Sequence, residues 1–139
     1  MKREDKYPDT KYFHYYNANP HNRKTGDCVI RAISVGTGES WEDTARGLFE
    51  LGVKHGYTQI CDWTIAKYLE SKGFIKMKEP RDFNNRKMSF IDFIEANSDN
   101  NLNAVANLGS HHIAVIKDNK VWDIWNSSYC TLHNYWVKP

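Results

Sequence analysis

The sequence predicts an α+β fold in which an N-terminal helical part packs on a C-terminal antiparallel sheet. Between residues 28 and 97, four segments carry apolar residues at helical spacing. After Asn97 the sequence changes to short strand-like runs with a turn between two of them. Helices followed by an antiparallel sheet are typical of the α+β class. The length of 139 residues and the 40% hydrophobic content fit a single domain over residues 1–139.

The first 25 residues show neither helical nor sustained strand periodicity. They contain Pro8, Pro20 and a Tyr-rich stretch at residues 12–16. Proline removes a backbone donor and interrupts regular elements. We therefore expect residues 1–25 to form an extended arm with room for one short strand.

The first helix is expected over residues 28–35. Gly26 and Asp27 supply a turn and an N-cap in front of it. Apolar residues occupy most sides of this segment, so the helix should be short and buried. Gly36 and Gly38 are expected to end it.

Three further helices have recognisable ends. Ser40 caps the second, which runs to Gly52, and Ser40 with Asp43 imitates a capping box. The third helix is expected over residues 62–72 and the fourth over residues 90–97.

The C-terminal part should supply the sheet. Four strands are predicted, over residues 102–108, 111–117, 121–125 and 135–137. Asp118 and Asn119 lie between the second and third of these strands and are expected to form a hairpin tip.

Composition and charge exclude several classes of function. Lys and Arg number 19 and Asp and Glu 17, and the net charge of +2 is too small to indicate a nucleic-acid-binding surface. No apolar run approaches the ~18 residues of a membrane span, and the N-terminus lacks the apolar stretch of a signal peptide. The three cysteines show no C-x-x-C spacing, which argues against a disulfide framework or a structural zinc site. We expect reduced thiols in the cytoplasm.

Cys28 is the strongest candidate nucleophile. It lies in the first turn of a predicted helix, where unpaired N–H groups and the helix dipole stabilise a thiolate. The helix is too apolar to lie on the surface, so its N-terminus is expected to emerge from the core at a cleft. Cys61 also precedes a predicted helix, but nothing recognisable pairs with it.

The predicted hairpin offers a base and an orienting partner for that cysteine. With a three-residue loop, His111 is diagonal to Asp123 on one face of the strands; with a two-residue loop, His112 is diagonal to Asp123 and His111 faces Asn126. The residues alone leave both registers open. In either register we expect the second histidine to be a polar surface residue.

Four stretches of the chain resemble small papain-like proteins of phages, mobile elements and Gram-positive bacteria. They are residues 19–32 (NPHNRKTGDCVIRA), 111–115 (HHIAV), 123–125 (DIW) and 135–138 (YWVK). The resemblance extends from about Asn19 to Lys138, and its G-D-C-x-x-R-A element is fairly specific. It implies a papain-like fold with the cysteine on a central helix and the histidine and its partner on a sheet.

The resemblance also implies roles for individual residues. Alignment on Ala114 and Val115 places the family's histidine on His111 and its acid on Asp123, so a Cys28, His111, Asp123 triad is implied. Members of the family often have Asp where this chain has Asn126, which makes Asn126 a supporting residue.

An oxyanion site is implied in the same way. Its donors would be the backbone N–H of Cys28 and a side-chain amide from the arm. Asn19 is the preferred amide because it lies in the matching stretch, with Asn17 and Asn22 as the other candidates.

The expected function is that of a cysteine peptidase or amidase acting through an acyl-thioester on a peptide or amide substrate, without a cofactor or a metal. Acyl transfer to an amine would use the same residues. The alternative is a non-catalytic interaction protein, such as a phage-encoded host-defence antagonist, on the same scaffold. Its sequence support is the basic arm, including Arg23 and Lys24, and binding of a protein partner would then replace catalysis.

Overall fold

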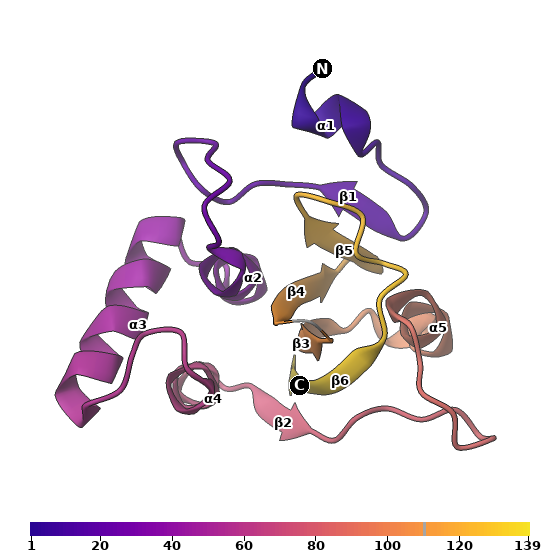
Figure 1. Ribbon diagram of the computed structural model, residues 1–139. Coiled ribbons are helices and arrows are strands. Elements are labelled where there is room, and N and C mark those ends of the chain that lie inside the picture. The colour runs from indigo at the N-terminus through magenta and orange to yellow at the C-terminus, as the bar shows by residue number, and fades with distance from the viewer. Residues whose placement is uncertain (110) are drawn as a thin grey trace.

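The computed structural model describes residues 1–109 and 111–139. Its helices pack against a six-stranded mixed sheet (Figure 1), which confirms the α+β class. The helices are α1 (Arg3–Lys6), α2 (Cys28–Thr37), α3 (Trp41–His55), α4 (Asp62–Ser71) and α5 (Phe90–Ala96), followed by a 3₁₀ turn at Ser98–Asn100. The strands are β1 (Phe13–Tyr15), β2 (Ile75–Met77), β3 (Asn103–Leu108), β4 (His112–Lys117), β5 (Lys120–Asp123) and β6 (Leu132–Lys138).

The sequence predicted a C-terminal, antiparallel sheet, and the structure differs on both points. Its strand order is β1-β5-β4-β3-β6-β2, and β1 pairs with β5 in parallel. Both outer strands, β1 and β2, come before the other four strands in the chain. They cover the outer edges of β5 and β6, whose backbone donors and acceptors would otherwise lack partners.

The N-terminal arm contains the short strand for which the sequence left room. Residues 13–15 form β1, and a single helical turn, α1, precedes it. Strand β2 was not predicted from the sequence. All three of its residues are exposed, so it lacks the alternation of buried and exposed positions that reveals a strand.

Helix α2 differs from the prediction at each of its ends. Asp27 is at the N-cap position, but its side chain makes no capping hydrogen bond. Gly36 does not end the helix; a Cβ there would lie 3.0 Å from Cγ2 of Val105, so glycine allows α2 to approach β3 closely. Gly38, in the left-handed conformation, ends it instead. The predicted caps Ser40 and Ser89 each accept a backbone hydrogen bond.

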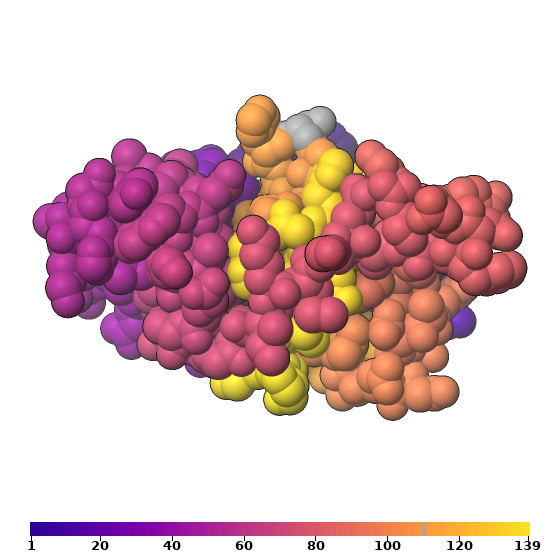
Figure 2. Space-filling view, turned by 90° about the horizontal axis from the view of Figure 1, so that it is seen from below, coloured from indigo at the N-terminus to yellow at the C-terminus, as the bar shows by residue number. Residues whose placement is uncertain are grey.

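Two hydrophobic clusters cover the two faces of the sheet. One face is covered by α2 and α4, with α3 packed on their outer side, and the other face by α5, as Figure 1 shows. Side chains alternate between the faces along each strand, so Val115 contacts the first cluster and Ala114 the second. Seen from below, the C-terminal strand reaches the surface between the α3–α4 side and the segment around residues 80–100 (Figure 2).

In the described part of the chain, no helix has the length and apolar character that crossing a bilayer requires. The longest, α3, has 15 residues and charged side chains along its exposed face.

Candidate active site

Cys28 begins α2, the helix that lies across β4. The side chain is half-buried and lines a cleft of about 540 Å³. Because the first residues of a helix have backbone N–H groups without intrahelical partners, the sulfur lies in a positive field. The structure therefore places Cys28 where the sequence predicted it.

The β4–β5 hairpin determines which histidine approaches this cysteine. Lys117 pairs with Lys120, so the loop has two residues, Asp118 and Asn119. Both have positive φ, at 53° and 58°, as a type I′ turn requires and as Asn and Asp tolerate. Of the two registers that the sequence left open, the two-residue loop is the one formed.

This register brings His112 next to Asp123. Nε2 of His112 lies 2.6 Å from Oδ2 of Asp123, and the Asp123 side chain is buried while that of His112 is partly exposed. Nε2 is thereby committed to Asp123, while the imidazole lines the same cleft as Cys28 and interacts with its thiol. The structure thus brings Asp123 to an imidazole, as the sequence predicted.

The expectation that His111 is this histidine is wrong. A shift of one residue in strand register moves each side chain to the opposite face. His111 is exposed, has a φ of +60° and lies at the rim of the cleft. It is the second, surface histidine that the sequence analysis expected.

Cys28 and His112 stabilise each other's charged forms. Burial by itself raises the pKa of the Cys28 thiol. The hydrogen bond and charge of His112, the N–H of Ile113 and the charge of Arg31 outweigh burial and hold this pKa below its usual value. Burial by itself lowers the pKa of His112, but its hydrogen bonds to Asp123 and Cys28 raise it to about 9. Both shifts favour a thiolate–imidazolium pair.

Asp123 is 2% exposed and fully engaged. Oδ2 accepts from His112 and from the hydroxyl of Ser127 at 2.7 Å, while Oδ1 accepts from the N–H of Ile124 at 2.7 Å and from Nη1 of Arg31 at 2.9 Å. Burial alone raises the pKa of Asp123, and these partners, His112 first, lower it below its usual value. Asp123 is therefore held as a carboxylate that can orient the imidazole.

Asn126, the alternative third residue, has a different role. Its side-chain oxygen accepts hydrogen bonds from the backbone N–H and the hydroxyl of Ser128. It therefore shapes the turn after Asp123 and makes no hydrogen bond to His112.

The side chain of Asn19 is also committed elsewhere. It is 5% exposed, donates to Oδ2 of Asp27 at 3.2 Å and accepts from the N–H of His21. It does not line the cleft. The structure thus places Asn19 behind Cys28 as a support for Asp27, in conflict with the expected oxyanion role.

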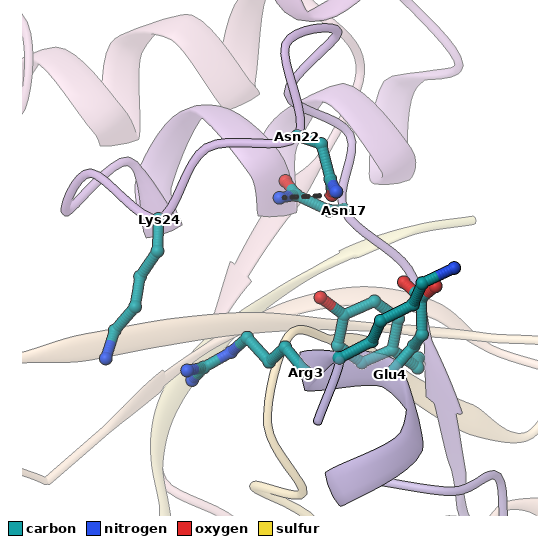
Figure 3. Close-up of a pocket in the computed structure, with 7 residues that line it drawn as sticks. Arg3, Glu4, Asn17, Asn22 and Lys24 are labelled. Carbon is teal, nitrogen blue, oxygen red and sulfur yellow. Dashed lines mark hydrogen bonds between the residues drawn. The ribbon is translucent and has the colours of Figure 1, made fainter.

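The other two amide candidates lie in a separate hollow of about 400 Å³ (Figure 3). There Nδ2 of Asn17 donates to Oδ1 of Asn22 and to the carbonyl oxygen of Arg23. Arg3 and Lys24 also line this hollow, whereas Cys28 does not. The structure therefore offers no side-chain amide from the arm as an oxyanion donor, and the backbone N–H of Cys28 is the remaining expected donor.

The cleft beside Cys28 has an apolar lining and a polar rim. Aliphatic side chains come both from the helical side and from the sheet, namely Val29, Ile60, Ile65, Leu108 and Ile113. Asp62, His111 and His133 contribute polar groups. Trp125 lies beside the imidazole of His112, with ring centroids 4.9 Å apart.

Sequence reasoning missed three residues that support the site: Arg31, Ser127 and Trp125. Arg31 and Trp125 carried a signal, because they lie in the stretches 19–32 and 123–125 that carry the resemblance, and Arg31 also follows Asp27 by four residues on one face of a helix. Cys61, the rival nucleophile, is in contact with the carbonyl of Thr58 and the hydroxyl of Thr64. Within residues 1–109 and 111–139, no three His, Cys, Asp or Glu side chains are grouped to hold a metal ion.

Comparison with known proteins gave no match to a family model, a curated protein or a solved structure. The chemistry of the site is therefore argued from its own geometry.

Proposed function

We propose that this protein is a cysteine hydrolase of papain-like fold that cleaves a peptide or amide bond through an acyl-thioester. The observation that carries the proposal is that Cys28, at a helix N-terminus, and His112 line the same cleft, while His112 binds the buried carboxylate of Asp123. A nucleophile, a base and a residue that orients the base are the parts that acyl transfer requires.

The order of the parts supports the papain-like assignment. Cys28 begins a helix packed on a sheet, and the histidine and the acid follow on adjacent antiparallel strands. This is the arrangement that the resemblance of residues 19–32 implies, with His112 in place of His111.

The reaction follows from the charges of the pair. The Cys28 thiolate attacks the carbonyl carbon, and the carbonyl π electrons move to the oxygen, which the backbone N–H of Cys28 faces. The His112 imidazolium protonates the leaving amine as the C–N bond breaks. A water molecule, deprotonated by His112, then attacks the thioester, which releases the acid and returns the proton to the pair.

Covalent labelling tests the proposal without knowledge of the substrate. A peptidyl vinyl sulfone should add one mass equivalent to the wild-type protein, located on Cys28 by peptide mapping. His112→Ala should suppress the adduct, and His111→Ala, its matched neighbour, should not. Equal labelling of Cys28, Cys61 and Cys130 in the folded protein would contradict the proposal.

A further inference from the structure

Behind the candidate triad, five polar side chains form a buried, continuous network. Arg31 lies at its centre: Nε donates to Oδ1 of Asp27 at 2.9 Å, and Nη1 donates to Oδ1 of Asp123 at 2.9 Å. The other oxygen of Asp27 accepts from the indole N–H of Trp41 at 2.9 Å and from Asn19 at 3.2 Å. The network therefore connects the arm, α2 and α3 with the end of β5.

We propose that Arg31 is a positioning residue: by bridging Asp27 and Asp123 it holds the carboxylate of Asp123 in the orientation from which it binds His112. This inference rests on the proposed roles of Cys28 and His112.

The division of the two carboxylate oxygens supports this role. Arg31 and the N–H of Ile124 bind Oδ1, which leaves Oδ2 for His112 and Ser127. A carboxylate bonded at both oxygens cannot rotate about its Cβ–Cγ bond without breaking charged hydrogen bonds. The guanidinium group suits this task, because its planar fork presents donors in two directions.

Burial makes Arg31 hard to replace by water. Asp27 is 6% exposed, Arg31 8% and Asp123 2%. Two carboxylates at such sites need a cation, because a buried charge without a partner carries a large desolvation penalty. Arg31 supplies one positive charge that both carboxylates share.

Other ionisable groups also face this network. His112 and Cys28 lie on the cleft side, and Tyr15 of β1 lies near both Arg31 and Asp123. Arg3 and Glu4 of α1 act on Tyr15, and Cys130 is close enough to Asp123 to be affected by its charge. Among them Arg31 is the cation that contacts both carboxylates directly.

The test is the pH dependence of Cys28 alkylation by iodoacetamide, measured from pH 4 to 9 by peptide mapping of full-length protein. The variants are Arg31→Gln, Arg31→Lys and, as an exposed control, Arg46→Gln. Thermal unfolding followed by circular dichroism identifies which variants are folded.

In folded Arg31→Gln, the loss of the cation should raise the pKa of Asp123, and a protonated Asp123 no longer supports the imidazolium. The acid limb of the alkylation profile should move to higher pH by about one unit, which lowers the rate by about tenfold at pH values below both limbs. Arg31→Lys, which keeps the charge but reaches one carboxylate at a time, should fall between Arg31→Gln and wild type. Arg46→Gln should match wild type.

A wild-type profile in folded Arg31→Gln, or one that is lower by the same factor at every pH, would reduce Arg31 to a purely structural residue and overturn the inference. If Arg31→Gln does not fold, the alkylation profile of Arg31→Lys provides the test. A wild-type profile in Arg31→Lys would then overturn the inference. Wild-type Cys28 that reacts no faster than Cys130 at pH 6 would instead remove the proposed function, and this inference with it.

Discussion

Two cysteines of this chain begin helices, and only one of them faces an imidazole. Cys28 is the first residue of α2 and Cys61 is the N-cap residue of α4. Both are half-buried, and both thiols have a pKa below the usual value. For Cys61 the main cause is a hydrogen bond with the hydroxyl of Thr64; for Cys28, the hydrogen bond and charge of His112 overcome the opposing effect of burial.

The difference between Cys28 and Cys61 shows that a helix N-terminus stabilises a thiolate but does not supply a base. It favours a thiolate at both positions, but it cannot accept the proton or return it to a leaving group. That capacity comes to Cys28 from β4, a strand distant in the sequence. Four predictions test whether this difference separates a catalytic thiol from a structural one.

Removal of the two sulfurs should have the most unequal effects. Cys28→Ala should abolish hydrolysis and covalent labelling completely, because no other group can form the thioester. Cys61→Ala should leave hydrolysis and covalent labelling within about twofold of wild type. Each variant should lose only about 1–2 kcal/mol of unfolding free energy, because both cysteines are half-buried. Labelling, turnover of a peptide-amide library and urea unfolding measure these effects. Full activity of folded Cys28→Ala would establish that the protein is not a cysteine hydrolase.

The two adjacent histidines provide the next largest contrast. His112→Ala removes the imidazolium and should slow alkylation of Cys28 at pH 6 by about tenfold or more, since each pKa unit regained by the thiol is a factor of ten in thiolate. His111→Ala should change the rate by less than about twofold. Alkylation of Cys61 in the same samples is the internal control. If His111→Ala slowed alkylation of Cys28 and His112→Ala did not, the hairpin would have the three-residue loop.

The pH range of activity should follow the coupled pair. Cys28, with its lowered pKa, should become a thiolate below the usual range of a thiol, and the imidazolium of His112 should persist until its pKa of about 9. A bell-shaped profile of kcat/KM with an alkaline limb near pH 9 is therefore expected, since the ion pair is lost as His112 deprotonates. Because this pKa is raised on folding, the stability that His112 contributes is complete below its unfolded value of 6.5 and is lost as the pH rises through about 9. A pKa near 6.5 for His112, measured by NMR titration of its imidazole, would assign the alkaline limb to another group.

The smallest effect is expected at Ser127. Ser127→Ala removes one hydrogen bond to Oδ2 of Asp123 but leaves the contacts with His112 and Arg31. A buried acceptor that loses one neutral donor costs about 1–2 kcal/mol, which urea unfolding should detect. Hydrolysis should fall only several-fold, and a decrease as large as that of His112→Ala would mean that Ser127 itself orients the imidazole.

The sequence predicted most of the elements that build the site. Helices α2 to α5 and strands β3 to β6 were placed to within a few residues, because their periodicities and caps are strong local signals. Cys28 and Asp123 were identified from their positions at a helix start and on a hairpin strand.

The choice between His111 and His112 was not predictable. It depends on whether the hairpin loop has two residues or three, and Asp118-Asn119 fits either turn. The role of Arg31 is hidden in the sequence because an Asp directly before a helix predicts a capping residue, whereas the carboxylate of Asp27 binds Arg31, Trp41 and Asn19. Strand β2 and the parallel pairing of β1 depend on contacts distant in sequence.

The two-residue turn at Asp118 and Asn119 makes the chemistry of this protein depend on a length as much as on residue types. The turn lies at the far end of β4, a strand of six residues, about 20 Å from His112 at ~3.4 Å per residue. If Lys117, Asp118 and Asn119 formed a three-residue loop instead, the facing partner of every side chain in β4 would change and the two histidines would exchange, although no residue near Cys28 had changed. In this fold, a substitution on a distant surface turn that shifts the pairing can therefore act as an active-site mutation.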